Sequence, residues 1–214
     1  MRANAHIVGM DALFSNRFAL PTAVASILLL TFAVPALRLR LREGSWGIVF
    51  HRHADPFQAA IGTAMGVCVA AIVAGTAIYA AIGAEGVGAW TWPAWTSRLG
   101  WALIVTGVGV TVVAQWQMGR SWRIGIDDRP TPLVTRGLFA FVRNPIFTAM
   151  IIVLAGGVLV VPSVASIALW LGTVLVLAFQ SRLEEIHLVT LHGDAYRAYA
   201  ARVGRFWPGV GRLT

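Results

Sequence analysis

The sequence has 214 residues, of which 57% are hydrophobic and only 12% charged, and its 17 basic residues, all arginine, outnumber nine acidic ones. An ordinary soluble domain carries about 25% charged residues, and the single cysteine, Cys68, together with the long apolar runs, excludes a disulfide scaffold and a disordered chain. The arginines lie between apolar runs and not in a patch interleaved with aromatic residues, so we expect no nucleic-acid partner.

The hydropathy pattern predicts an all-α fold, a polytopic integral membrane helical bundle with about five transmembrane helices, because about 20 apolar residues of helix cross a bilayer. The first three apolar segments run from Phe18 to Leu37, from Phe57 to Ile82 and from Leu99 to Met118. Arginines follow the first segment where a signal peptide would carry a cleavage site, so we expect a retained helix. We treat the chain as one structural domain, with residues 1–118 as an N-terminal part and 119–214 as a C-terminal core.

Residues 145–180 contain no charged side chain, and as one helix they would extend about 54 Å, which exceeds any bilayer. Pro162 and Ser163 mark a turn in the middle of this run. We therefore expect a C-terminal helical hairpin of Pro145–Val161 and Val164–Gln180, followed by a cytoplasmic C-terminal segment.

Arginine placement predicts the orientation of the bundle. Only Arg2, Arg17 and Arg98 fall on one side of the predicted crossings, and the other arginines fall on the opposite side. Cytoplasmic loops are enriched in arginine, so we expect an inner-membrane protein with its N-terminus outside and its C-terminus in the cytoplasm. An outer loop would then hold Trp90, Trp92 and Trp95 as an interfacial belt.

Small residues in the second segment suggest a close helix contact. Gly62 and Gly66 have the Gly-x-x-x-Gly spacing that lets two helices approach each other. Packing within the monomer and a weak homodimer contact both explain it, so we expect a monomer or a weak homodimer.

The first candidate for chemistry is the mouth of the fourth helix, where Arg143 and Asn144 precede Pro145. Proline fits the first turn of a helix, and the N–H groups of such a terminus attract a carboxylate or a phosphate. The alternative is that Arg143 snorkels to the membrane interface.

The second candidate is the segment Arg182-Leu-Glu184-Glu185-Ile-His187-Leu188, which we expect to continue the fifth helix until Gly193 ends it. Two adjacent carboxylates are costly beside an anionic leaflet unless they bind a cation. The alternative is that Arg182, three residues before Glu185, pairs with it. A third group, in the loop before the second apolar segment, could be read as metal ligands: His51, His53 and Asp55. This basic loop offers no further ligand, so we predict no metal site.

The two candidate segments resemble the isoprenylcysteine carboxyl methyltransferase and phospholipid methyltransferase superfamily of integral membrane enzymes. The family reads G-x-[FY]-x-x-[VI]-R-H-P-x-Y at its cofactor loop, and this chain has Gly137-Leu-Phe-Ala-Phe-Val-Arg143-Asn144-Pro145-Ile-Phe147. The family's second motif is E-E-x-x-L, then a glycine, two tyrosines three apart, and R-[FY]-x-P. Here these stand as Glu184-Glu185-Ile-His-Leu188, Gly193, Tyr196, Tyr199 and Arg205-Phe-Trp-Pro208.

Two positions depart from the family pattern. Asn144 replaces the histidine and still offers a side-chain donor and acceptor, whereas Phe147 replaces the tyrosine and loses its hydroxyl. Cofactor binding through backbone groups is compatible with both changes.

The resemblance implies S-adenosyl-L-methionine as the methyl donor and a lipophilic acceptor from the bilayer, such as a membrane lipid, an isoprenoid or a quinone-like molecule. Glu184 or Glu185 would attract the cationic ammonium and sulfonium, and Arg143 the carboxylate. The residues expected to bind the cofactor are Val134, Gly137, Leu138, Arg143, Asn144, Pro145, Phe147, Glu184, Glu185 and Leu188. The expected catalytic residues are Arg205, which would orient the acceptor, Glu185, and His187 as the base for a hydroxyl acceptor.

Two other functions remain open at this stage. One is an NADPH-dependent membrane reductase of the sterol or enone type, and the other is a non-catalytic membrane scaffold that keeps the fold. Binding of S-adenosylhomocysteine or of NADPH separates these alternatives from methyl transfer.

Overall fold

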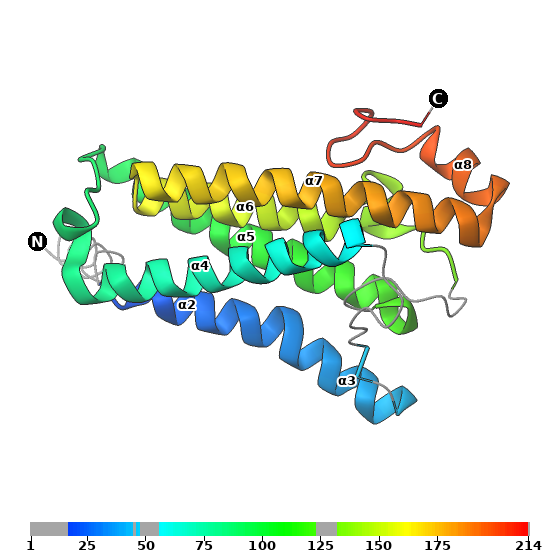
Figure 1. Ribbon diagram of the computed structural model, residues 1–214, viewed down its shortest axis with the longest axis horizontal. Coiled ribbons are helices and arrows are strands. Elements are labelled where there is room, and N and C mark those ends of the chain that lie inside the picture. The colour runs from blue at the N-terminus through cyan, green and yellow to red at the C-terminus, as the bar shows by residue number, and fades with distance from the viewer. Residues whose placement is uncertain (1–16, 45, 48–55, 123–131, 214) are drawn as a thin grey trace, which may run out of the picture.

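The fold is a bundle of long helices that lie side by side (Figure 1). The computed structural model describes residues 17–44, 46–47, 56–122 and 132–213, and within these residues it contains helices and two isolated β-bridges but no β-strand. Arg2 and the histidines His51 and His53 lie outside the described residues. The elements are α2 (Ala19–Leu28), the π-helical turn η1 (Leu29–Ala33), α3 (Val34–Glu43), α4 (Pro56–Gly86), α5 (Ala94–Met118), the 3-10 turns η2 (Gly119–Ser121) and η3 (Gly137–Ala140), α6 (Pro145–Val160), α7 (Val164–His192) and α8 (Asp194–Ala200). The predicted all-α membrane fold is confirmed.

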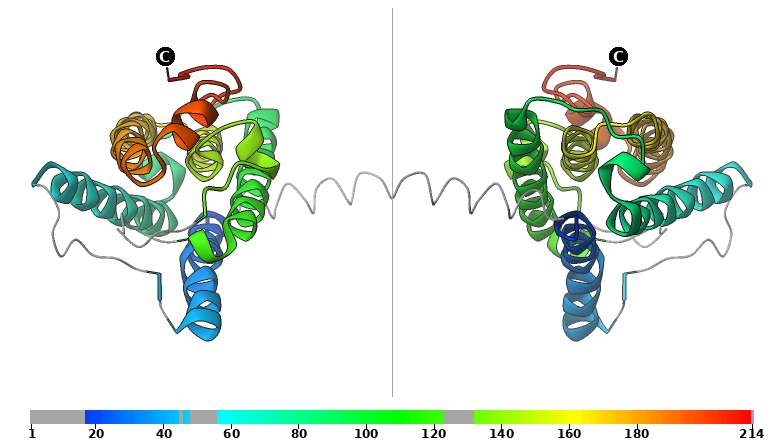
Figure 2. Two further views of the ribbon diagram at one scale, coloured as in Figure 1. Left: turned by 90° about the vertical axis from the view of Figure 1, so that its right-hand side faces the viewer. Right: turned by 90° about the vertical axis from the view of Figure 1, so that its left-hand side faces the viewer.

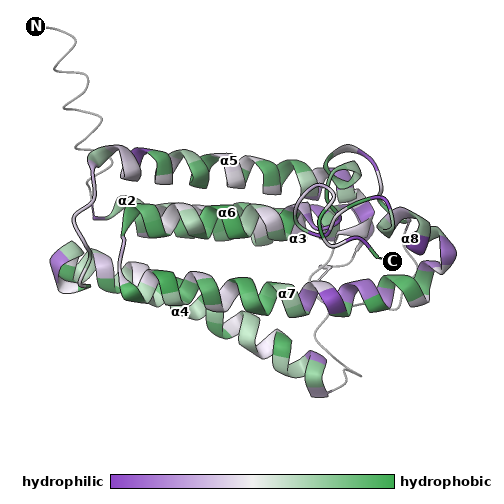
Figure 3. Ribbon diagram, turned by 90° about the horizontal axis from the view of Figure 1, so that it is seen from above, coloured by the Kyte–Doolittle hydropathy of each residue, from purple (hydrophilic) through white to green (hydrophobic). Residues whose placement is uncertain are grey.

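Four stretches of this bundle are long and apolar enough to cross a membrane: Ala19–Glu43, Pro56–Gly86, Ala94–Ser121 and Val164–His192. Helix α6 is shorter, with 16 residues, or about 24 Å of helix. It lies alongside α5 and α7 in the bundle (Figure 3). The chain is therefore an integral membrane protein, and the number of crossings stays a prediction.

The predicted helical hairpin is present. Helix α6 ends at Val160, and α7 starts again at Val164 after the turn at Pro162. Ser163 begins α7 with a capping box: its hydroxyl accepts from the backbone N–H of Ser166, and the Ser166 hydroxyl accepts from the backbone N–H of Ser163. As predicted, α7 then continues unbroken past the charged segment to His192, and Gly193 ends it with a positive φ of 54°.

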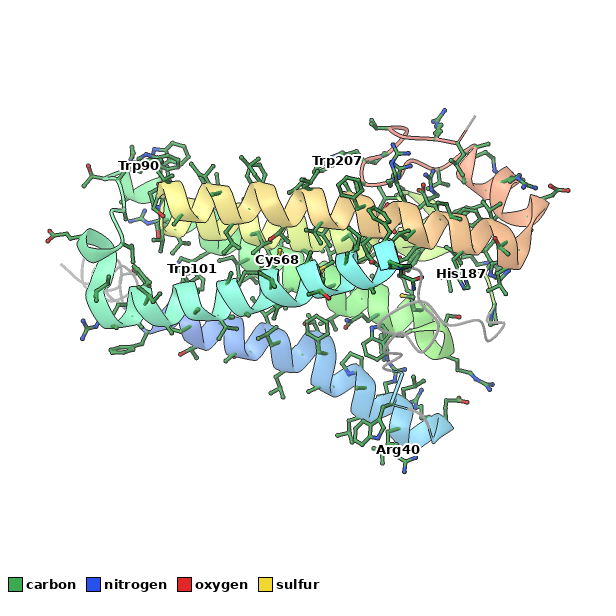
Figure 4. The ribbon with its side chains drawn as sticks, viewed as in Figure 1. Arg40, Cys68, Trp90, Trp101, His187 and Trp207 are labelled. Carbon is green, nitrogen blue, oxygen red and sulfur yellow. The ribbon has the colours of Figure 1, made fainter. Side chains whose placement is uncertain are left out.

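The two ends of the bundle differ in polarity (Figure 3). One end holds the charged second half of α7, the C-terminal ends of α3 and α5, and α8. We call this end of the bundle the arginine-rich end. The loop before α5 and the hairpin turn meet at the other end, where the backbone N–H of Trp90 donates to the carbonyl of Pro162 at 2.7 Å. Figure 4 accordingly shows Trp90 and His187 at opposite ends. The side of the membrane that each end faces stays a prediction.

Several helix boundaries differ from the predicted ones. Helix α5 begins at Ala94 and not at Leu99, so Trp95 lies in its first turn and not in the preceding loop. Pro93 explains this start, because it supplies an extended residue just before the helix. The first segment extends to Glu43 through the π-helical turn, in which the carbonyl of Thr31 accepts from Gln115 Nε2 at 2.7 Å.

Glycine residues bring α5 and α6 into backbone contact. A Cβ atom added at Gly100 would lie 2.6 Å from the carbonyl oxygen of Gly156, and one at Gly156 would lie 2.5 Å from that of Gly100. Small residues at such contacts drive helix association in bilayers. The predicted glycine contact within the monomer is not seen at Gly66, where an added Cβ meets open space. The close approach is therefore seen between α5 and α6 and not at Gly66.

Replacing Gly156 with alanine tests this contact. The added methyl group would press on the backbone of α5, and such overpacking costs about 1–3 kcal/mol. Gly157 is the matched control, because its added Cβ meets nothing within 4 Å. Thermal unfolding in detergent is expected to show a lower melting temperature for Gly156→Ala and an equal or higher one for Gly157→Ala. Equal melting temperatures for the two variants would contradict the backbone contact.

Candidate active site

The candidate site is a cavity at the arginine-rich end. It lies where α6 begins and where the charged second half of α7 continues past the start of α6. The hairpin brings together two segments that are distant in sequence, because Asn144 from the first and Glu184 from the second line the same cavity. Side chains from η3, α7 and α8 complete its wall. The lining residues are Met118, Ser121, Pro132, Leu133, Val134, Phe139, Arg143, Asn144, Glu184, Glu185, His187, Leu188, Leu191, His192, Tyr196 and Tyr199.

Arg143 is buried beneath this cavity, with 1% of its side chain exposed. Its guanidinium donates to Glu185 through Nε, to the carbonyl of Ala200 through Nη1 and to that of Gly211 through Nη2, at 3.1, 3.0 and 2.9 Å. Further hydrogen bonds reach Glu185 and the carbonyl of Val203. A guanidinium has five N–H groups, and these contacts use all of them. Arg143 therefore does not snorkel to the membrane interface.

Glu185 also forms an ion pair with a second arginine, Arg205. Arg205 donates to it in a two-pronged arrangement, from Nε to Oε1 at 2.9 Å and from Nη2 to Oε2 at 2.7 Å. The hydrogen bonds that Arg205 donates to the Glu185 carboxylate raise the pKa of Arg205 above its ordinary value. We call Arg143, Glu185 and Arg205 the Glu185 cluster. Glu185 thus pairs with these two arginines, and the alternative of Arg182 as its partner is not what the structure shows.

The C-terminal segment is fixed to the start of α6 by backbone hydrogen bonds. The N–H groups of Arg143 and Asn144 donate to the carbonyls of Gly204 and Arg205, at 2.8 and 3.1 Å. The Thr148 hydroxyl donates to the carbonyl of Phe206 at 2.9 Å. These bonds hold Arg205 beside Glu185 and occupy the two N–H groups that precede Pro145, which is the first helical residue as predicted.

Two buried tyrosines connect α8 to the 3-10 turn η3. Tyr196 and Tyr199 pack edge to face with ring centroids 5.9 Å apart, and the Tyr199 hydroxyl donates to the carbonyl of Phe139 at 2.6 Å. Burial raises the pKa of Tyr199 to about 12 and raises that of Tyr196 as well. Both hydroxyls are therefore neutral at physiological pH.

The adjacent residues Glu184 and Glu185 have different partners. Glu184 lines the cavity as a half-buried side chain and accepts from Gln180 Nε2 at 3.0 Å. Glu185 is turned toward the two arginines and is 7% exposed at its side chain. This difference follows from helix geometry, since neighbouring residues on a helix do not share a face.

The cavity contains part of the set predicted from the sequence. Seven predicted residues are among those that line it: Val134, Arg143, Asn144, Glu184, Glu185, His187 and Leu188. The other five are not among its lining residues: Gly137, Leu138, Pro145, Phe147 and Arg205. Leu138 instead anchors η3 to α5, because its N–H donates to Gln117 Oε1 at 2.8 Å.

Sequence reasoning did not assign the tyrosine pair to the site. Tyr196 and Tyr199 line the cavity, together with the apolar Leu133 and Phe139. The three-residue spacing of the two tyrosines is part of the second family motif. This spacing was the one sequence feature that could have assigned the pair to the cavity. The apolar wall residues carry no such signal.

Two comparisons with known proteins agree with this architecture. The family model "Phospholipid methyltransferase" matches residues 95–195. Among solved structures, the fold is similar to that of the eukaryotic intramembrane Ras methyltransferase ICMT (isoprenylcysteine carboxyl methyltransferase), with a TM-score of 0.59 at 16% identity over 93% of this chain and 70% of that one. No curated protein matches the sequence.

Fold and family match together define an integral membrane methyltransferase. The family match over residues 95–195 and the similar fold both support the resemblance to the isoprenylcysteine carboxyl methyltransferase and phospholipid methyltransferase superfamily that the motifs around Arg143 and Glu184 predicted.

The burial of the Glu185 cluster leads us to expect that Glu185 contributes to the stability of the folded protein. Glu185→Gln keeps the shape of the side chain but leaves two arginines without their carboxylate, and removing one member of a buried ion pair costs about 3–5 kcal/mol. Glu184→Gln is the matched control on the neighbouring residue, and we expect it to unfold close to the parent. Thermal unfolding in detergent measures both, and equal stability of the two variants would show that the cluster does not hold the fold together.

Proposed function

We propose that the chain is an S-adenosylmethionine-dependent methyltransferase that acts on a lipophilic acceptor at the cytoplasmic face of the inner membrane. The observation that carries this proposal is the shared cavity, in which residues from the Arg143 motif and the Glu184 motif face each other. The predicted orientation, with the C-terminus inside, puts this cavity on the side where the cofactor is made.

The residues of the cavity fit the chemistry of this cofactor. Glu184 presents a carboxylate for a cationic group, and Leu133, Val134 and Phe139 offer an apolar wall for a nucleoside. The Asn144 amide stands where the family has histidine and supplies a donor and an acceptor. When bound, S-adenosylmethionine would supply the methyl group from its sulfonium.

Within this proposal the two glutamates have separate roles. Glu184 binds the cationic part of the cofactor, because its carboxylate faces the cavity. Glu185 is a positioning residue, because its oxygens are hydrogen-bonded to Arg143 and Arg205. Arg143 acts in the same way, since its N–H groups are all used within the protein. It therefore aligns Asn144 and does not itself hold the cofactor's carboxylate.

The acceptor would reach the cavity from the bilayer, with its polar head at the membrane interface. Arg205 keeps 16% of its side chain exposed but does not line the cavity, so it would orient the part of such a head group that extends beyond the cavity. His187 lines the cavity and would take the proton of a hydroxyl acceptor, whereas a carboxylate acceptor needs no base. Holding donor and acceptor in line in a dry pocket contributes about 7–11 kcal/mol to such a transfer.

Calorimetric titration with S-adenosylhomocysteine tests the proposal. We expect the parent protein to bind it and Glu184→Gln to bind it about 10- to 100-fold more weakly, which corresponds to the loss of a charged hydrogen bond of about 1.5–3 kcal/mol. Glu85→Gln is the matched control, because this exposed glutamate lies at the opposite end of the bundle.

The outcomes that contradict the proposal are distinct. Tight binding of NADPH in place of S-adenosylhomocysteine would indicate a reductase, and binding of neither would indicate a scaffold. Parent-like affinity of Glu184→Gln would place the cofactor elsewhere in the protein.

A further inference from the structure

A second cavity, of about 420 Å³, lies at the arginine-rich end between α3 and the end of α5. The turn η2 separates it from the candidate active site, because Ser121 lines the site and Arg120 lines this second cavity. Figure 2 shows that α3 and the C-terminal segment lie on opposite sides of the bundle. The two cavities therefore lie on either side of η2 at the same end.

The wall of this second cavity is strongly basic. Its charged lining residues are Arg38, Arg42 and Arg120 against one acid, Glu43. Arg120 Nε pairs with Glu43 at 3.0 Å, and its side chain is 80% exposed. Among the lining residues that the structure describes, two positive charges therefore remain in excess.

The arrangement of these arginines on α3 is unfavourable unless an anion is present. Arg38 and Arg42 are four residues apart on one helix face, where like charges repel each other. The guanidinium of Arg38 is held over the ring of Trp116, 5.8 Å from its centroid, and so stays at the cavity. A bound anion between the two helices would offset this repulsion.

The floor of the cavity is apolar and lies toward the middle of the bundle. Leu30, Val34 and Val112 form it, one to two helical turns before Arg38 on the first helical run and before Trp116 on α5, and Trp116 and Trp122 also line the cavity. The helical run from Ala19 to Glu43 spans about 38 Å, which exceeds the roughly 30 Å hydrocarbon core. The arginines therefore lie at headgroup level and the floor at the level of the acyl chains.

The helix beside this floor has an unusual and specific shape. The π-helical turn Leu29–Ala33 lies just before the basic part of α3, and such turns are frequent at functional sites. The Gln115 amide fixes it to α5 through the carbonyl of Thr31 at 2.7 Å, and Gln115 itself lines the cavity. This hydrogen bond keeps the basic face of α3 directed toward α5.

We propose that this cavity binds an anionic glycerophospholipid of the surrounding leaflet. The phosphate would accept charge-assisted hydrogen bonds from the arginines, and the acyl chains would lie along the apolar floor. Basic pockets between transmembrane helices bind anionic headgroups in this way. A soluble phosphate would satisfy the arginines but leave the floor and the tryptophans without an apolar partner, so the lipid is the better match. This site is independent of the proposed methyl transfer.

Native mass spectrometry of the full chain in detergent tests the lipid site. The protein is titrated with phosphatidylglycerol and with phosphatidylcholine of the same acyl chains. We expect tighter binding of phosphatidylglycerol, and a double variant Arg38→Gln with Arg42→Gln to weaken it by about fivefold for each arginine removed. The matched control is Arg197→Gln with Arg202→Gln, which removes the same charge from exposed positions on α8 and just after it. We expect this control to bind within about twofold of the parent.

Three results would overturn the proposal. Equal binding of the two lipids would exclude recognition of the anionic head, and equal weakening in both double variants would indicate bulk charge. Displacement of the lipid by glycerol 3-phosphate at equal concentration would indicate a soluble phosphate site. Arg42→Gln alone, at an exposed position, gives the same readout if the double variant does not fold.

Discussion

The structure of the arginine-rich end depends on the burial of one carboxylate. A glutamate taken out of water costs several kcal/mol unless opposite charges and hydrogen bonds compensate it. Glu185 obtains this compensation from Arg143 at the start of α6 and from Arg205 in the C-terminal segment. Three separate parts of the chain must therefore meet at one point, and the carbonyls of Ala200 and Gly211 complete the set by accepting from Arg143.

This constraint determines which groups face the candidate active site. Because Glu185 holds the arginines, the neighbouring Glu184 is directed to the cavity. Hydrogen bonds to Asn144 and Thr148 hold the C-terminal segment against the start of α6, where Asn144 lines the cavity. Tyr199 adds the connection to η3 through Phe139. The hydrogen bonds of this charged cluster thus hold α6, α7 and the C-terminal segment together beside the cavity.

Both cavities lie at the arginine-rich end of the bundle, where charged side chains gather. The glycine contact between Gly100 and Gly156 lies at the opposite end and lets α5 and α6 pack closely. One end of the bundle is therefore marked by close helix packing, and the other by charged clusters beside cavities.

The amino-acid sequence alone was enough to predict the membrane fold, the hairpin and the resemblance to the methyltransferase superfamily. A charge-free run longer than any bilayer requires a turn, and Pro162 with Ser163 supplied it. Gly193 marked the end of α7, and the spacing of the two motifs predicted the superfamily that the family match confirms. These features are local, so residue order and composition are enough to read them.

The partners of Glu185 depend on the tertiary structure. Helical spacing suggested Arg182 as its partner, but Arg182 is exposed and gains little from an ion pair, whereas the buried Arg143 and the mostly buried Arg205 need one. The glycine contact likewise formed on α5 and α6 and not at Gly66, because it depends on which helices become neighbours. Burial and neighbourhood are properties of the folded chain, and no spacing along the sequence specifies them.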